Sequence, residues 1–214
     1  MDDGTVGVMS DDGLAHLRTC DPILATIIER VGPNGLQERR EGGQPEHYGA
    51  LVRSIVGQQL STKAAASIYR RLADRFGGRA PTPQEVLDDD PEELRAVGLS
   101  YAKVSFLRSL AEHVLNGSLE LERLDELTDD EVIAELTAVK GIGVWSAHMF
   151  LMFHLERPDI LAVGDLGIRK SMMLAYGLPA LPLPPEMEAL AEPWRPHRTL
   201  ACRYLWRALD NEPA

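Results

Sequence analysis

Start and stop signals for helices recur along the whole chain, and they constrain its fold more than any other feature. Asp21 precedes Pro22, which is typical of an N-cap residue followed by the first helical residue. Thr82 and Thr128 are each followed three positions later by Glu, the pattern of a capping box. No long alternation of apolar and polar residues bounded by hairpin turns occurs. The sequence therefore predicts an all-α fold of about nine or ten short helices.

The length and composition are those of a folded globular protein. The 214 residues, of which 44% are hydrophobic and 26% charged, suit one domain or two small lobes. Apolar runs stay short of the roughly 18 residues that cross a membrane, and the first residues lack the pattern of a signal peptide. We therefore expect a cytoplasmic protein without a membrane partner. Cys20 and Cys202 are too few for a disulfide framework, a four-cysteine zinc site or an iron–sulfur cluster.

The net charge of −11 argues at first against a polyanionic partner. However, residues 81–135 hold 15 acidic and 4 basic side chains, so this segment alone accounts for the charge of the whole chain. Residues 45–80, in contrast, hold 6 basic and 2 acidic side chains. We interpret 81–135 as a solvated acidic surface, and a polyanion could still approach another face.

The chain is predicted to divide into two lobes. Residues 1–20 contain several Asp and Gly residues, and we expect a flexible N-terminus there. Four prolines interrupt residues 178–185, which predicts an extended connector. We expect a central helical lobe at 45–135 and a terminal helical lobe made of 21–44 and 136–214. The hairpin described next falls in that terminal lobe.

Residues 137–147 place two glycines, Gly141 and Gly143, between two helical stretches. Such a turn can expose successive backbone N–H groups at the start of a helix, where partial positive charge favours a phosphate. It would bind a nucleic-acid backbone without a basic surface. The same pattern is equally typical of a plain connection between two helices.

The wider context of this turn resembles a known family. KGIGVWSA is followed, 22 residues after Gly143, by Asp165 in VGDLGIRK; LVRSIVGQQLSTKAAASIYRRL lies upstream and WRPHRTLACRYLW downstream. Together these motifs resemble the helix–hairpin–helix DNA glycosylase superfamily, and within it the compact form of the DNA-3-methyladenine glycosylase II, or alkylbase DNA glycosylase, family. The resemblance extends from about residue 21 to residue 206. It implies two helical lobes with the active site in the cleft between them.

The resemblance also implies the main site residues. Asp165 would be the catalytic carboxylate, although an aspartate here is also a typical N-cap for the helix that follows. Gly141, Gly143 and Lys140 would contact a DNA phosphate. The family requires no cofactor, but its hairpin often holds a structural Na⁺ or K⁺ ion through backbone carbonyls. By position these carbonyls would belong to the following residues: Thr137, Val139 and Ile142.

Further residues would open the duplex and hold the flipped base. Gln59 and Leu60 match the family's DNA wedge, whereas without the motif Leu60 would be read as a buried leucine between helices. Trp145, Met149 and Trp206 match positions that line the base pocket, where aromatic faces attract a cationic base. Ordinary core packing is an equally good interpretation of each tryptophan. Family members often have tyrosine where this chain has Met149.

The resemblance thus implies a monofunctional enzyme that excises alkylated bases of the 3-methyladenine type from double-stranded DNA and leaves an abasic site for base excision repair. Bifunctional relatives carry a lysine where this chain has Trp145, and tryptophan cannot form a Schiff base, so we expect no lyase activity. We expect a monomer, associated with nucleoid DNA if the source is prokaryotic. Two alternatives stay open: a non-catalytic hairpin module that binds DNA or senses lesions, and a glycosylase for a different damaged base.

Overall fold

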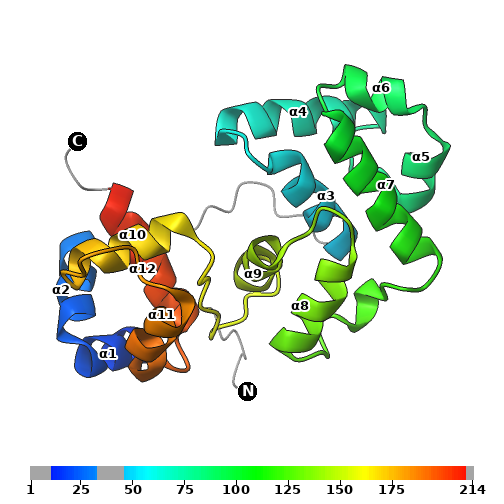
Figure 1. Ribbon diagram of the computed structural model, residues 1–214. Helices are drawn as coiled ribbons and strands as arrows, with labels where there is room; N and C mark the ends of the chain where they lie inside the picture. The colour runs from blue at the N-terminus through cyan, green and yellow to red at the C-terminus, as the bar shows by residue number, and fades with distance from the viewer. Residues whose placement is uncertain (1–10, 33–45, 211–214) are drawn as a thin grey trace. The chain divides into compact units, whose positions relative to one another are not determined.

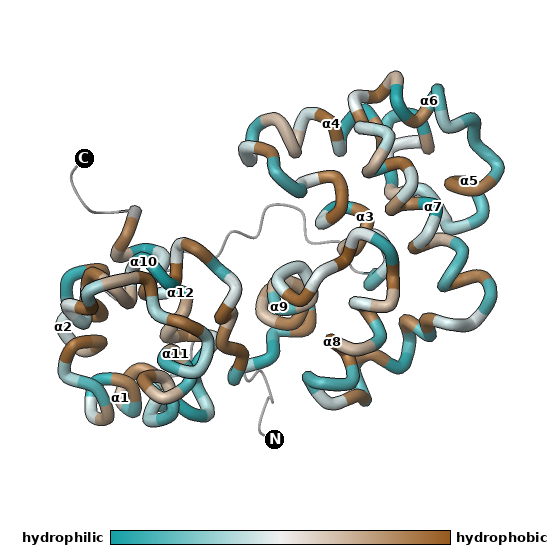
Figure 2. Tube along the Cα trace, in the orientation of Figure 1, coloured by the Kyte–Doolittle hydropathy of each residue, from teal (hydrophilic) through white to brown (hydrophobic). Residues whose placement is uncertain are grey.

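The computed structural model describes residues 11–32 and 46–210, which contain twelve α-helices and two short 3-10 helices and no strand (Figure 1). The expected all-α class is therefore confirmed. Hydrophobic and hydrophilic segments alternate along the helices, as expected for helices that each bury one face (Figure 2). Among these residues, no helix is both long and apolar enough to span a membrane.

The described residues form two compact units. One unit comprises 11–32 and 151–210, and the other comprises 46–150. The helices of the first unit are as follows: α1 (Asp11–Cys20), α2 (Pro22–Val31), α10 (Leu166–Ala175), α11 (Pro184–Ala191), η3 (Glu192–Trp194) and α12 (Arg198–Asp210). Those of the second are as follows: α3 (His47–Gly57), α4 (Thr62–Arg75), α5 (Pro83–Asp88), α6 (Pro91–Ala96), α7 (Tyr101–Leu115), η2 (Leu121–Arg123) and α8 (Asp129–Ala138). The boundary between the units falls inside α9 (Val144–Phe153).

The expectation of a flexible N-terminus over residues 1–20 is wrong for residues 11–20, which form α1. Leu14 and Leu17 lie one turn apart and are both buried, so the helix has an apolar face to pack against α2 and α12. Asp11 and Asp12 occupy its first turn, where the helix dipole favours negative charge. Residues 1–10 lie outside the described part of the chain.

Asp21 organises the first unit. As the N-cap of α2, its Oδ1 atom accepts hydrogen bonds from the backbone N–H groups of Ile23 and Leu24, at 2.9 and 3.0 Å. Its Oδ2 atom accepts hydrogen bonds from the hydroxyl of Tyr176 and from Nε1 of Trp194, the latter at 2.8 Å. Burial, together with the hydrogen bond to Asp21, raises the pKa of Tyr176. Trp194 is fully buried, so this tryptophan belongs to the core of the first unit.

In the second unit, α3 packs against α4 and α7 and buries Leu51, Val52, Ile55 and Val56. The predicted capping boxes are present at Thr82 and Thr128, with both reciprocal hydrogen bonds formed. Short helices such as α5 and α6, of six residues each, raise the number of helices above the nine or ten expected. The predicted connector is shorter than expected, because α11 begins at Pro184 and proline fits the first turn of a helix.

The hairpin between α8 and α9 belongs to the unit of residues 46–150 rather than to the terminal unit, where the sequence had placed it. Its contacts explain this grouping. The Lys140 ammonium donates to the Ser105 hydroxyl on α7 at 2.9 Å, and the Lys140 backbone N–H donates to the Ser109 hydroxyl. The boundary expected at 135/136 is therefore displaced to α9.

The basic stretch at 45–80 and the acidic segment at 81–135 partly neutralise each other. The guanidinium of Arg75 donates two hydrogen bonds of 2.6 Å to the carboxylate of Asp89 and a third, of 3.0 Å, to Glu93. Arg79 pairs in the same bidentate way with Glu85. Arg75 and Arg79 are therefore engaged in ion pairs with the acidic segment, although a count of charges along the sequence would assign both to a nucleic-acid surface.

Candidate functional site

Asp165 caps the N-terminus of α10 in the first unit. Its backbone is extended, and its Oδ1 atom accepts a hydrogen bond of 2.9 Å from the backbone N–H of Ile168. The residue is 9% exposed, yet Leu166 beside it is 64% exposed. A desolvated carboxylate thus lies next to exposed apolar surface, at the positive end of a helix dipole. The N-cap interpretation is correct, and the catalytic role of the carboxylate stays a prediction.

Trp206 on α12 reaches the same carboxylate. Its indole Nε1 donates to Oδ1 of Asp165 at 2.8 Å. The indole also stacks with Phe153, with ring centroids 5.8 Å apart and an interplanar angle of 29°. Two of the predicted site residues, Asp165 and Trp206, are therefore in direct contact. Phe153 was not predicted from the sequence, although a large aromatic residue at the end of an apolar helix was a visible signal. Its side chain is 54% exposed in the structure.

The hairpin turn depends on Gly141. Its φ of +88° lies in the left-handed region, and a Cβ atom there would lie 2.2 Å from Cγ of Phe106. Only glycine satisfies both conditions, because any side chain would overlap the Phe106 ring. The first glycine of the motif is thus explained by the fold of the protein itself.

Gly143 has no such internal reason to be glycine. A Cβ atom at this position would meet no atom of the described residues within 4 Å, and its φ is not in the left-handed region. The residue is exposed and immediately precedes α9. The missing side chain therefore leaves the positive end of α9 open to a ligand from outside, which is the geometry that suits a phosphate oxygen.

The loop between α3 and α4 carries the predicted wedge. Gln59 has a φ of +57°, which is rare for a residue with a side chain, and Leu60 after it is 38% exposed. Leu60 is therefore not the buried leucine between helices that its residue type alone would favour. Ser61 ends the loop as the N-cap of α4, accepting a hydrogen bond from the backbone N–H of Ala64.

Gln58, which was not predicted as a site residue from the sequence, connects this loop to the hairpin. Its side-chain amide donates to the backbone carbonyl of Gly141 at 2.9 Å. The Lys103 ammonium on α7 donates to the carbonyl of Val56 at 2.7 Å and so holds the end of α3. The wedge loop and the hairpin are thus neighbours in one unit, although 83 positions separate Gln58 from Gly141.

The carbonyls predicted to hold a cation lie at the end of α8 and in the turn. Val139 accepts a hydrogen bond from the backbone N–H of Ile142 at 3.1 Å. Among the described residues, no backbone N–H donates to the carbonyls of Thr137 or Ile142. Carbonyl oxygens are suitable ligands for a hard cation, so this donor set fits the predicted ion.

The other two residues predicted for the base pocket lie on α9. Trp145 is 44% exposed and Met149 is partly buried, both on the part of α9 that belongs to the unit of residues 46–150. Arg169, which follows Asp165 on α10, donates to the carbonyl of Pro182 at 3.0 Å and so anchors the connector. The base-pocket assignment of Trp145, Met149 and Trp206 stays a prediction, as does an active site between the two lobes.

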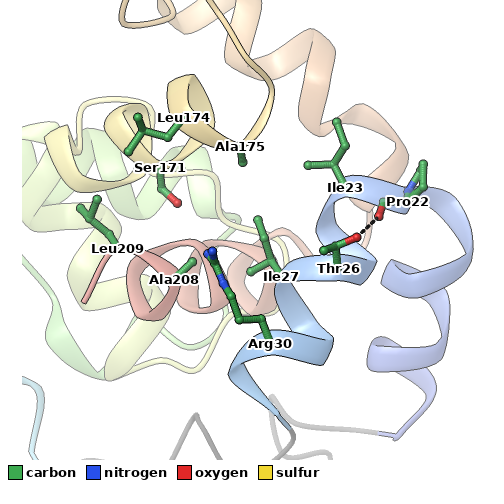
Figure 3. A pocket seen from close by; sticks show the side chains of 10 residues that line it. All are labelled: Pro22, Ile23, Thr26, Ile27, Arg30, Ser171, Leu174, Ala175, Ala208 and Leu209. Carbon is green, nitrogen blue, oxygen red and sulfur yellow. Dashed lines mark hydrogen bonds between the residues drawn. The ribbon is translucent and has the colours of Figure 1, made fainter. Parts of the chain in front are cut away.

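A cavity of about 390 Å³ lies in the first unit, between α2, α10 and α12 (Figure 3). Its wall is mostly aliphatic, with the side chain of Arg30 at one side and Ser171 and Leu174 contributed by α10. None of the predicted site residues lines it. The cavity and Asp165 are therefore separate sites, although residues of α10 line the cavity and Asp165 caps the same helix.

The all-α fold, the glycine hairpin and the buried N-cap aspartate define a helix–hairpin–helix protein. The profile of the HhH-GPD superfamily of base excision DNA repair proteins matches residues 52–196. This match covers more than half of the chain, and the chain belongs to that superfamily.

Individual relatives agree with this assignment. The chain is 36% identical over 197 residues to DNA-3-methyladenine glycosylase 1 of Schizosaccharomyces pombe, a match that covers 90% of this chain and 84% of that protein. It is 28% identical to DNA-3-methyladenine glycosylase 2 of Escherichia coli, covering 76% of this chain and 57% of that protein.

Two solved structures share the fold along most of their length. The 3-methyladenine DNA glycosylase of S. pombe, in complex with abasic DNA, has a TM-score of 0.80 and 34% identity, covering 91% of this chain and 95% of that one. A DNA-3-methyladenine glycosidase from Bacillus halodurans also has a TM-score of 0.80, with 35% identity, covering 96% and 92%.

Proposed function

We propose that this protein is a DNA glycosylase that hydrolyses the N-glycosidic bond of alkylated bases, of the 3-methyladenine type, in double-stranded DNA. The observation that carries the proposal is the buried, N-capping carboxylate of Asp165 beside exposed apolar surface. The names of its relatives supply the substrate class. The resulting abasic site is the product expected of base excision repair.

The chemistry asks little of the enzyme beyond this carboxylate. As the glycosidic bond breaks, the sugar gains oxocarbenium character, and a carboxylate beside the ring stabilises the developing positive charge. The same carboxylate can orient or deprotonate the attacking water. An alkylated base carries a positive charge and leaves readily as a neutral species. One carboxylate is therefore sufficient, without a separate acid for the leaving group.

Binding of DNA would rely on the backbone rather than on a basic surface. The open N-terminus of α9 at Gly143 would receive a phosphate, with Lys140 next to it. A Na⁺ or K⁺ ion held by the carbonyls of Thr137, Val139 and Ile142 would add positive charge there when bound. An acidic composition and DNA binding are thus compatible.

The wedge would stabilise the opened duplex and so offset part of the cost of extruding the base. Extruding a nucleotide costs a few kcal/mol of unstacking and unpairing. Leu60 would fill the gap in the stack, and the amide of Gln59 would pair with the orphaned base. The left-handed backbone at Gln59 fits this role, because backbone strain concentrates at functional sites.

The reaction would stop at base release. Lyase chemistry requires an amine that forms a Schiff base with the sugar, and Trp145 stands where bifunctional relatives carry lysine. Borohydride added during turnover is therefore expected to trap no covalent adduct between the protein and DNA. A trapped adduct would contradict the monofunctional assignment.

Mass spectrometry of the bases that the purified protein releases from methylated duplex DNA tests the proposal. Release of methylated purines is the expected result. Release of oxidised or mismatched bases instead, from suitable duplexes, would assign a different specificity. Tight DNA binding without release of any base would make the protein a non-catalytic hairpin module and would contradict the proposal.

A further inference from the structure

The indole of Trp206 is held on two sides. Its N–H edge is engaged by Oδ1 of Asp165, and its ring stacks with Phe153. An aromatic residue that only offered a face to a flipped base would not need its N–H directed at a carboxylate. The hydrogen bond thus indicates a second task for Trp206.

Gly167, two residues after Asp165, makes this contact sterically possible. A Cβ atom at position 167 would lie 3.1 Å from Oδ1 of Asp165, 3.1 Å from Cδ1 of Trp206 and 3.3 Å from its Nε1. The backbone φ of Gly167 is not in the left-handed region, so conformation does not demand glycine there. Within the first turn of α10, glycine serves the close approach of the indole to the carboxylate.

The same unit contains a natural comparison. Asp21 is also a buried N-cap aspartate that accepts a hydrogen bond from an indole, that of Trp194, at 2.8 Å. There the tryptophan is fully buried and the tyrosine hydroxyl of Tyr176 binds the same oxygen, which makes a closed structural network. At Asp165 the indole donates instead to the oxygen that already binds the Ile168 N–H, and the neighbouring Leu166 is exposed.

We propose that Trp206 is a positioning residue for Asp165: its indole N–H fixes the orientation of the carboxylate, and Gly167 keeps the space that this contact needs. The inference rests on the proposed role of Asp165. Two donors on Oδ1, the Ile168 N–H and the Trp206 N–H, set the plane of the carboxylate group. A carboxylate fixed in this way stabilises the oxocarbenium ion without having to reorganise as charge develops.

The decisive variant removes only the N–H group. Replacing Trp206 with benzothienylalanine, in which sulfur takes the place of the indole nitrogen, keeps the ring faces and their size. We expect the single-turnover rate of base release from methylated duplex DNA to fall about 10- to 100-fold, because a hydrogen bond to a charged group is lost. The enzyme concentration at half-saturation is expected to change less than about threefold, since the face available to a base is unchanged. A wild-type rate for this variant would overturn the proposal.

Trp206→Phe tests the same contact with natural residues. It is expected to lower the rate by at least as much as the benzothienylalanine variant. If the loss appeared instead as weaker binding of the lesion duplex, with an unchanged rate at saturation, Trp206 would act as a base-stacking face and the proposal would be overturned. Trp194→Phe is the matched control, which is expected to lower the melting temperature without a specific loss of the rate.

Gly167→Ala approaches the contact from the other side and keeps every reacting group. Alanine is favoured over glycine in helices, and this gain offsets part of the cost of the displaced contact, so the melting temperature is expected to change little. The rate is expected to fall about tenfold, because the added methyl group displaces the indole or the carboxylate. An unchanged rate would contradict the role given to Gly167.

Asp165→Asn separates this inference from the proposed function. If Asp165→Asn releases bases at the wild-type rate, the proposed function of Asp165 fails and the inference fails with it. If Asp165→Asn is inactive while the benzothienylalanine variant is fully active, only the positioning role of Trp206 fails.

Discussion

The side-chain amide of Gln58 donates a hydrogen bond to the backbone carbonyl of Gly141 at 2.9 Å. This single contact joins the loop that carries the proposed wedge to the turn that carries the proposed phosphate site. Both elements belong to the unit of residues 46–150. A DNA backbone held at the hairpin would therefore be held in a fixed register with the residues that open the duplex.

Gln58→Ala is expected to loosen this register. Losing a partly buried hydrogen bond costs about 1 kcal/mol of stability, and the rate of base release is expected to fall more than the affinity for undamaged DNA. Thermal unfolding and single-turnover assays measure the two effects. Gln84→Ala is the matched control, because Gln84 pairs with Asp88 on the exposed surface of α5 and no activity loss is expected there. Equal losses for the two variants would contradict a link between loop and hairpin.

Alanine at the two hairpin glycines is expected to affect different properties, namely stability at Gly141 and DNA affinity at Gly143. Gly141→Ala combines a positive φ with an overlap against Phe106, and a loss of about 2–4 kcal/mol in the free energy of unfolding is expected. Gly143→Ala meets no described atom, so its melting temperature is expected to stay within about 2 °C of the wild type, while DNA affinity falls. Denaturation and fluorescence anisotropy distinguish the two. Undiminished DNA binding by Gly143→Ala would refute the phosphate site.

Leu60→Ala tests the wedge. Because Leu60 is 38% exposed, its truncation is expected to cost less than about 1 kcal/mol of stability. Base release from duplex DNA is expected to slow at least tenfold, whereas release from a lesion placed opposite a gap, where no stack must be opened, is expected to slow much less. An equal effect on both substrates would mean that Leu60 does not act in opening the duplex.

The acidic helices are expected to confer a pH-dependent stability. The guanidinium of Arg75 hydrogen-bonds the carboxylate of Asp89 and holds the pKa of that carboxyl below its ordinary value of 3.8. A lowered pKa in the folded state adds stability above pH 3.8, and this stability is lost as the pH falls through the lowered value. Asp89→Asn is expected to cost about 1 kcal/mol at pH 7, a modest value because Arg75 is partly exposed.

Urea unfolding of the Asp89→Asn variant and the wild type between pH 7 and pH 2 measures this difference. The two free energies of unfolding are expected to converge at the acid end. Glu92→Gln is the control, since Glu92 forms only an exposed pair with Arg95 one turn away, and little change is expected. A constant gap at every pH would argue against the ion pair as its cause.

The local chemistry of the helix ends made much of this fold predictable. Asp21, Thr82 and Thr128 cap helices as their neighbours in sequence require, because an N-cap depends on atoms within three or four residues. Asp165 could be placed for the same reason. The turn at Gly141 was also visible, since a left-handed backbone selects glycine.

Contacts between distant residues could not be read in this way. Three contacts join segments that lie far apart in the sequence: the Phe106 ring against Gly141, the Gln58 amide on the Gly141 carbonyl, and the stack of Phe153 on Trp206. Hydrophobic periodicity predicts helices but not which distant residues meet. The hairpin was assigned to the wrong unit because its partners, Ser105 and Ser109, are ordinary helix residues in sequence. The helix at 11–20 was missed because its apolar face contains only a few residues.

The central claim is that the Asp165 carboxylate performs the hydrolysis. Asp165→Asn keeps the size of the side chain and an oxygen that can accept the N-cap hydrogen bond, so the fold is expected to survive. Release of methylated bases from methylated duplex DNA, measured under single turnover with equal amounts of folded protein, is expected to fall by at least about 100-fold in this variant, while DNA affinity is retained. Near-wild-type release by folded Asp165→Asn would contradict the claim.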